Sequence, residues 1–239
     1  MIKLEKKESI YFLTMDAGEN RWNTTFVREI AKALDTIEDD EGQGALITSS
    51  TDSKFFSNGL DLEWMQAPED HPDGGDREVF GEEFMYLMGR FITLPIPTVC
   101  ALNGHTFGAG FMFALSHDFR IMREDRGFIC ANEMQLGLPI PRPELALFKH
   151  KIPANAFFET VQLSKRWTGA DALKAGIVQG VSSFEELSEA ALRKAKELAP
   201  LANNRKNFGH QKEMLYGENA AINLAHGPAH MLKNSKYFE

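Results

Sequence analysis

The sequence predicts an α/β protein built from stacked β-β-α turns, with a helical region at its C-terminal end. The order of buried strand, tight corner and helix occurs twice, around residues 45–66 and again around residues 98–116. After about residue 153 the spacing of the apolar residues becomes helical. Because the glycines of the second corner lack the spacing of a dinucleotide fingerprint, a doubly wound nucleotide fold is not predicted.

The sequence predicts a hairpin at the N-terminal end, followed by a helix. Residues 2–15 alternate in polarity and then become apolar, which predicts a hairpin that turns near Lys7-Glu8. Asn23 or Thr24 is the predicted N-cap of the following helix, because apolar residues recur after it at helical spacing.

The first strand, corner and helix follow. Residues 44–48 predict a short buried strand, and residues 55–62 predict a strand-to-helix corner with Asp61 as the helix N-cap. Residues 67–76 have the composition of a surface loop. A helix is predicted over residues 77–94, since prolines follow it directly.

The rest of the chain contains a second set of strands and then helices. Strands are predicted at 98–102, 118–122 and 128–131, and helices at 109–116, 154–163, 170–175, 184–199 and 202–216. We expect residues 1–169 to form the core with the active site and residues 170–239 to form a helical C-terminal region.

Composition excludes several classes of function. The net charge of −8, with no basic stripe, argues against a nucleic-acid partner. No apolar run approaches the ~18 residues of a membrane span, and the N-terminus lacks the apolar segment of a signal peptide. Cys100 and Cys130 lie far apart in apolar surroundings, which predicts reduced core cysteines of an intracellular protein. His226 and His230 have metal-ligand spacing, but a Gly-Pro pair separates them and no third ligand is evident, so no metal site is predicted.

The most informative segment is Asn103–Asp118. Gly108, Ala109 and Gly110 lie between a buried strand and an apolar helix. Backbone N–H groups at the start of a helix have no intrahelical acceptor, so this corner suits a negatively charged oxygen. A phosphate loop is not indicated, because no Gly-Lys-Ser/Thr follows. Close packing of helix on strand is the alternative explanation when this segment is taken alone.

A second corner, Ser57-Asn58-Gly59-Leu60, favours a catalytic interpretation. Backbone N–H groups from two separate corners can converge on one oxygen. Two such donors form an oxyanion hole, in which each lies ~2.7–3.1 Å from the developing charge.

Together these segments resemble the crotonase (enoyl-CoA hydratase/isomerase) superfamily. The resemblance rests on Phe55–Leu62 and Ala101–Asp118, and it continues in the same order through Asn132–Leu138 and Trp167–Val178. It covers most of residues 1–180. The Δ3,Δ2-enoyl-CoA isomerase branch, including its plant-type members, is more similar than the hydratases. The resemblance implies a crotonase-like spiral of ββα turns and an acyl-CoA thioester as substrate.

The resemblance also implies roles for individual residues. By position, the N–H groups of Leu60 and Ala109 would hold the thioester oxygen. The family's hydratases use two glutamates, and this sequence has Met112 at the position of one and Glu133 at the position of the other. A single acid suits an isomerase, in which one glutamate moves a proton from C2 to C4 while the hole holds the dienolate. The implied reaction is isomerisation of 3-enoyl-CoA to 2-enoyl-CoA in unsaturated fatty acid oxidation.

The surroundings of this acid yield further expectations. Glu133 follows an apolar run, which predicts partial burial and a raised pKa. After Leu138 the family often has a Gly-rich loop, whereas this chain has the stiff segment Pro139–Pro143. That segment could reshape the acyl pocket or move Glu144 toward it, but the favoured expectation places Glu144 in a first helical turn facing solvent. The predicted substrate-binding residues are Ser57, Asn58, Gly59, Asp61, Leu62, Gly108, Gly110 and Met112.

Other functions stay open. A hydratase or thioester hydrolase of the same superfamily would need Glu144 or a bound water to compensate for Met112. A catalytically weak acyl-CoA-binding protein is a further alternative. A Ser-His-Asp hydrolase that pairs Ser57 or Ser116 with His117-Asp118 is not favoured, because no nucleophile elbow is present.

The remaining expectations concern partners and location. No cofactor is expected, because coenzyme A is part of the substrate. Apolar faces on the C-terminal helices predict packing against another subunit, and the resemblance implies a homotrimer or a dimer of trimers. An intracellular location is expected: cytoplasmic in a bacterium, with a peroxisomal location also compatible in a eukaryote.

Overall fold

A computed structural model describes residues 1–67, 75–217 and 226–238 of the chain. The strands are β1 (Ile2–Lys7), β2 (Ile10–Met15), β3 (Ala45–Ser50), β4 (Phe55–Ser57), β5 (Thr98–Leu102), β6 (His105–Phe107), β7 (Phe119–Arg123), β8 (Ile129–Cys130) and β9 (Gly180–Ser182). The helices are α1 (Thr24–Glu38), α2 (Leu62–Gln66), α3 (Phe80–Thr93), α4 (Ala109–Leu115), α5 (Arg142–Lys151), α6 (Ala154–Val161), α7 (Gly169–Lys174), α8 (Phe184–Leu198), α9 (Arg205–Tyr216) and α10 (Pro228–Lys233). Short 3₁₀ turns are η1 (Glu133–Leu136), η2 (Ala199–Ala202) and η3 (Ser235–Tyr237).

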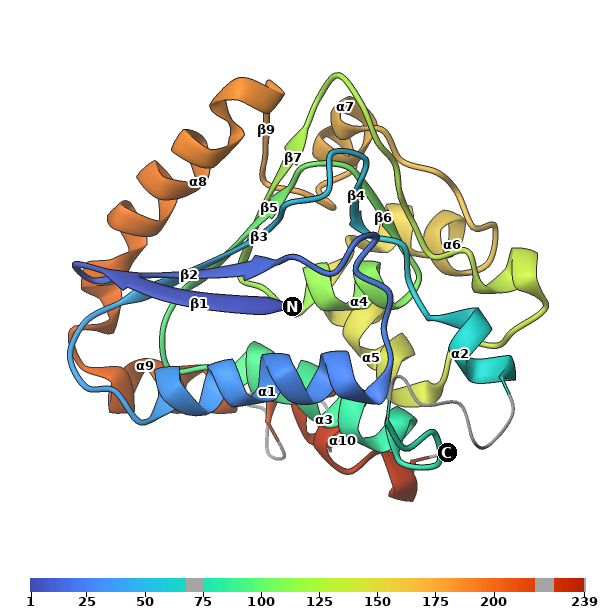
Figure 1. Cartoon of the computed structure of the whole chain (residues 1–239), viewed down its shortest axis with the longest axis horizontal. Helices are drawn as coiled ribbons and strands as arrows, with labels where there is room; N and C mark the ends of the chain where they lie inside the picture. Colours follow the sequence, from blue (N-terminus) through green and yellow to red (C-terminus); the bar gives the residue numbers. More distant parts are fainter. Residues whose placement is uncertain (68–74, 218–225, 239) are drawn as a thin grey trace.

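The strands form two sheets that the chain visits in alternation (Figure 1). A six-stranded sheet has the order β1-β2-β3-β5-β7-β9, and a three-stranded sheet has the order β4-β6-β8. Every pair is parallel except β1 with β2. Each turn of the spiral adds one strand to each sheet and then a helix, as in β3-β4-α2 and β5-β6-α4. The predicted stacked β-β-α turns are confirmed.

The predicted N-terminal hairpin and helix N-caps are present in the structure. The β1–β2 hairpin forms as predicted, with its turn at Glu8-Ser9, one residue later than expected. The side chain of Asn23 accepts a hydrogen bond from the Phe26 amide at 2.9 Å and caps α1. Asp61 accepts from the Trp64 amide at 3.1 Å and caps α2. Most of the loop predicted over 67–76 lies outside the described residues.

The six-stranded sheet is covered on both faces, which accounts for its apolar strands. One face packs on α8, which lies beside the sheet in Figure 1 on the side away from α4 and α5. The other face belongs to the main core, together with α1, α3, α4 and α10. Strand β9 was not predicted from the sequence. It joins the edge of this sheet next to β7 and lies within the region expected to be helical.

A buried ion pair ties α9 to the sheet. The Lys212 ammonium donates to Asp118 at 2.7 Å and to the Ile96 carbonyl at 3.1 Å. Burial opposes ionisation of Asp118, but the charges of Lys212 and Lys151 hold its pKa below the usual value. The neighbouring His117 instead bonds to the Phe113 carbonyl and to Thr48, and burial lowers its pKa to about 3. Because His117 and Asp118 bond to these other groups, they do not form a Ser-His-Asp triad.

Within the described residues, no helix has the length and apolar character needed to span a bilayer.

Candidate active site

The two corners predicted from the sequence meet in space. Gly59 and Gly108 both have positive φ angles, of 80° and 49°. A β-carbon on Gly59 would lie 3.0 Å from the Phe107 carbonyl oxygen and 3.9 Å from the Ala109 nitrogen. The chain therefore needs glycine here, both for the backbone turn and for the close approach of the corners. A pocket of about 250 Å³ opens between them.

The amides of Leu60 and Ala109 are free to bind a ligand. Leu60 lies opposite Trp22 in a parallel bridge, but the hydrogen bonds of that bridge use the Gly59 carbonyl and the Asp61 amide. Ala109 is the first residue of α4, so its N–H has no acceptor inside the helix. Among the described residues, neither amide donates a hydrogen bond. Both residues line the pocket.

The first corner is held rigidly by the segment before α1. The Asn58 amide donates to the Glu19 carbonyl at 2.9 Å, and the Asn58 side chain donates to the Glu19 carboxylate at 2.8 Å. The Trp22 indole donates to the Ser57 hydroxyl at 3.0 Å, and that hydroxyl donates to the Asn20 carbonyl at 2.7 Å. These bonds fix the direction of the Leu60 amide.

The second corner packs directly on the first. A β-carbon on Gly110 would lie 2.6 Å from the Ser57 β-carbon, so only glycine fits at this point of α4. The glycines thus serve close packing as well as exposing the backbone. The sequence left two explanations for these glycines open, an anion-binding corner and close packing of a helix on a strand, and the two are compatible.

Glu133 places a carboxyl group beside both corners. It begins η1, and its Oε1 atom lies 3.2 Å from the position that a β-carbon on Gly108 would occupy. Its Oε2 atom is buried without a hydrogen-bond partner. Burial raises the pKa of Glu133, as the sequence predicted. A buried, unpaired carboxylate of raised pKa is suited to take up a proton near neutral pH.

The three predicted catalytic residues and half of the predicted substrate-binding residues line this pocket. Those that do are Asn58, Gly59, Leu60, Leu62, Gly108, Ala109 and Glu133. Ser57, Gly110 and Met112 are buried and do not line it. Four lining residues were not predicted: Arg21, Asn132, Leu136 and Leu138. The exposed leucines after Glu133 are the signal that could have indicated an apolar rim.

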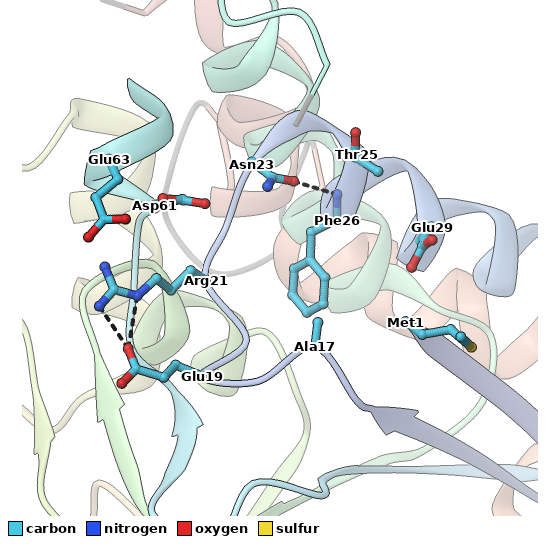
Figure 2. Close-up of a pocket in the computed structure, with 10 residues that line it drawn as sticks. All are labelled: Met1, Ala17, Glu19, Arg21, Asn23, Thr25, Phe26, Glu29, Asp61 and Glu63. Carbon is cyan, nitrogen blue, oxygen red and sulfur yellow. Dashed lines mark hydrogen bonds and ion pairs between the residues drawn. The ribbon is translucent and has the colours of Figure 1, made fainter. Parts of the chain in front are cut away.

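Asp61 lies in a different, larger pocket of about 570 Å³ (Figure 2). This pocket contains four carboxylates, those of Glu19, Glu29, Asp61 and Glu63. Its Arg21 also lines the smaller pocket and forms an ion pair with Glu19 at 2.8 Å. The surplus of negative charge disfavours an anionic ligand in the larger pocket.

The expectation that Glu144 faces solvent was wrong. Glu144 lies in the first turn of α5, as expected, but only 6% of its surface is exposed. The cause is the packing of α5 against α4, where Phe148 meets Phe111 edge-to-face at 5.3 Å between ring centroids. Burial, together with the charge of Glu133, raises the pKa of Glu144 to about 8.

No group of three or more His, Cys, Asp or Glu side chains within the described ranges is placed to hold a metal ion. The rings of His226 and His230 stack on each other with centroids 4.9 Å apart.

Comparison with known proteins identifies the family of this chain. Residues 5–224 match the family "Enoyl-CoA hydratase/isomerase". The chain is similar to the peroxisomal enoyl-CoA delta isomerase 2 of Arabidopsis thaliana, with 32% identity over 227 residues that cover 93% of this chain and 95% of the relative. The peroxisomal enoyl-CoA delta isomerase 1 of the same plant is 34% identical over 223 residues, covering 91% and 90%.

Among solved structures, human mitochondrial Δ3-Δ2-enoyl-CoA isomerase superposes with a TM-score of 0.79 and 25% identity, covering 90% of this chain and 82% of the human chain. The expected crotonase-like fold is thereby confirmed. The chain belongs to the enoyl-CoA hydratase/isomerase, or crotonase, family.

Proposed function

We propose that this protein is an enoyl-CoA delta isomerase, which converts a 3-enoyl-CoA to the 2-enoyl-CoA. The observation that carries the proposal is that Glu133 is the single carboxylate among the residues lining the pocket between the two corners. Relatives that match over nine-tenths of the chain are named enoyl-CoA delta isomerases, which supports the same reaction.

The proposed first step removes a proton from C2. The thioester oxygen accepts hydrogen bonds from the Leu60 and Ala109 amides, which places C2 near Glu133. The Glu133 carboxylate takes the proton, the C2–H bond breaks, and its electron pair passes into the conjugated dienolate. The two amides stabilise the negative charge that develops on the oxygen.

The second step returns a proton to C4. The protonated Glu133 gives up the proton that it took from C2: its O–H bond breaks, a C4–H bond forms, the double bond moves to C2–C3, and the thioester carbonyl is restored. Atoms and charge balance, so the reaction needs no oxidant, metal or further cofactor. Coenzyme A enters as part of the substrate.

Met112 supports isomerisation over hydration. It is buried in α4, and a thioether cannot activate a water molecule or transfer a proton. Hydration remains a second candidate because one observation favours it: Glu144 supplies another buried acid whose pKa responds to Glu133.

The decisive variant is Glu133→Gln, which keeps the size of the side chain and removes its basicity. We expect isomerase activity on a 3-enoyl-CoA to fall by about 10²- to 10⁴-fold while binding of CoA esters is retained. Assays for double-bond shift, water addition and thiol release separate isomerase, hydratase and hydrolase. Full activity in the variant contradicts the proposed role of Glu133. Tight binding of CoA esters without turnover of any of them would identify a binding protein.

The proposal extends to assembly and location. We propose a homotrimer or a dimer of trimers, assembled through a C-terminal helical region over residues 170–239. Light scattering at micromolar protein tests this, and a single species of monomer mass contradicts it. The reaction is compatible with a cytoplasmic or a peroxisomal location, and two of the relatives are named as peroxisomal.

A further inference from the structure

We infer that Asn132 is a positioning residue for Glu133: its side-chain amide donates a hydrogen bond to the Glu133 carboxylate and holds that carboxylate beside the second corner. The inference rests on the proposed isomerase function, because it assigns a partner to the proposed base. Asn132 lines the same pocket and was not singled out from the sequence.

The side chains of Asn132 and Glu133 meet at one point of the second corner. The Oδ1 atom of Asn132 lies 3.4 Å from the position that a β-carbon on Gly108 would occupy, and the Oε1 atom of Glu133 lies 3.2 Å from the same position. Both residues line the pocket between the two corners. The carboxamide and the carboxylate therefore share the small space that Gly108 leaves open.

The backbone that carries Asn132 is fixed. Its carbonyl accepts hydrogen bonds from the Gln135 amide at 3.0 Å and from the Leu136 amide at 3.3 Å, at the start of η1. Two residues earlier, the Cys130 carbonyl accepts a hydrogen bond from the Gly108 amide at 3.0 Å. The same short segment is thus tied to the second corner, so the Asn132 side chain starts from a fixed point beside Gly108.

The Asn132 carboxamide has no partner of its own. Among residues 1–67, 75–217 and 226–238, its side chain forms no hydrogen bond. Asn58, which supplies the other carboxamide of this pocket, is instead held by the Glu19 carboxylate at 2.8 Å. A carboxamide has two N–H donors and an acceptor oxygen, and rotation about its last side-chain bond exchanges these two ends. No hydrogen bond opposes that rotation in Asn132.

The Glu133 carboxylate lacks a donor that would stabilise its ionised form. Its Oε2 atom is buried without a hydrogen-bond partner. In the proposed reaction the Leu60 and Ala109 amides are used by the thioester oxygen. A buried carboxylate is costly when it is not hydrogen-bonded, and a donor to the charged form favours ionisation. An N–H of Asn132, turned toward Oε1, supplies that donor.

Charged neighbours contribute little to the ionisation of Glu133. Arg21, the one cation among the residues that line the pocket, is paired with Glu19 at 2.8 Å. Cys130 of β8 and Glu144 of α5 are both neutral near pH 7, because burial raises the pKa of the thiol to about 11 and, together with the charge of Glu133, that of Glu144 to about 8. Helix α4 contains only apolar residues and glycine. Burial and hydrogen bonding therefore decide whether the base is ionised.

A bond from Asn132 would divide the work between the two carboxylate oxygens. Oε1 is held beside Gly108, and Oε2 stays free to take the proton from C2 and to return it at C4. The carboxyl group can turn about the held oxygen, so that one acid reaches both carbon atoms. Asn132 touches neither carbon and carries no proton, and it acts only through Glu133.

The test measures kcat and kcat/KM on 3-hexenoyl-CoA across pH in the wild type and two variants. Glu133 must be ionised to act as a base, so activity falls as the pH falls through its pKa. Asn132→Leu removes the donor at similar size. We expect kcat to fall by about tenfold with KM nearly unchanged, and the acidic limb of the profile to move to higher pH. Asn132→Asp puts a second carboxylate beside Glu133 and should move that limb further, by about one to two pH units.

The matched control is Asn155→Leu. Asn155 is an exposed carboxamide on α6 that lines a different pocket, so its replacement should leave kcat and the pH profile unchanged. Urea unfolding of each variant checks the fold. Aspartate has nearly the shape of asparagine, so Asn132→Asp decides the question even where Asn132→Leu does not fold.

Two results overturn the inference and leave the proposed function intact. One is a wild-type kcat and pH profile in both Asn132 variants. The other is an equal loss of activity at every pH with the acidic limb unmoved, which is the effect of a merely structural change. A wild type that does not isomerise the substrate overturns the proposed function, and this inference with it.

Discussion

The Glu133 carboxylate lies against Gly108, with its Oε1 atom 3.2 Å from the point at which a β-carbon on that glycine would stand. The residue that gives the second corner its turn therefore also makes room for the acid. Because Ala109 follows directly, the proposed base and one proposed oxyanion donor are positioned by the same short stretch of backbone. Substitutions in this stretch should change catalysis more than stability.

Gly108→Ala tests this coupling. The added methyl group would displace the Glu133 carboxylate slightly, because the contact of 3.2 Å is too close. We expect kcat/KM on a 3-enoyl-CoA to fall by about tenfold, less than the roughly 100-fold that a misplacement of 1 Å costs. The positive φ of 49° adds a strain of about 1–2 kcal/mol for a residue other than glycine. Gly42→Ala is the matched control, since Gly42 has a φ of 86° and open space around it. Equal activity in the two variants would show that Gly108 does not position Glu133.

Gly110→Ala should destabilise the fold. Its β-carbon would lie 2.6 Å from the β-carbon of Ser57 and 2.9 Å from the Ser57 carbonyl oxygen, so the two corners must move apart. We expect the free energy of unfolding, measured in urea, to fall by about 1–3 kcal/mol.

The control for that substitution is Gly81→Ala, in an open part of α3. There a new methyl group meets nothing, and helix propensity predicts a gain of up to about 1 kcal/mol. A Gly110→Ala protein as stable as the wild type would contradict the close approach of α4 to β4.

Lys212→Met should cost about 2–3 kcal/mol of unfolding free energy, because the half-buried Asp118 carboxylate loses its 2.7 Å partner but keeps its hydrogen bonds from Thr98. The double variant with Asp118→Asn should lose less than the sum of the single effects. Arg193→Met, which breaks an ion pair exposed on α8, should change stability by less than about 1 kcal/mol. Additive losses in the double variant would indicate that Lys212 and Asp118 do not interact.

Glu144 should make stability depend on pH. Its pKa is raised in the folded protein from 4.5 to about 8. Between these values the folded state keeps a proton that the unfolded state releases, so the free energy of unfolding falls as pH rises, by up to about 1.4 kcal/mol per pH unit. Below the lower value the contribution is fully present, and above about pH 8 it is lost.

Glu144→Gln removes this dependence. We expect the stability of the variant relative to the wild type to increase steadily from about pH 5 to pH 8, as measured by urea unfolding at several pH values. Parallel stability curves for the two proteins would show that Glu144 titrates as an exposed acid.

Local sequence signals were sufficient to predict most of the elements of the fold. The hairpin before residue 15, the caps at Asn23 and Asp61, and the recurring strand-corner-helix order depend on short-range chemistry, and the structure confirms them. Strand β9 is only three residues long, and it is a strand because β7 offers it an unpaired edge. When a segment becomes a strand only by pairing with a distant strand, its own residues contain little signal of that structure.

The sequence by itself predicted two glycine-containing corners as parts of a site, and its resemblance to a known family added one acid, Glu133. Turn and helix-start chemistry can be recognised from neighbouring residues. Only the tertiary structure decided that the corners touch, that Asp61 belongs to another pocket and that Glu144 is buried. Burial is set by what packs on a helix face, and for Glu144 that neighbour, α4, lies some thirty residues earlier in the chain.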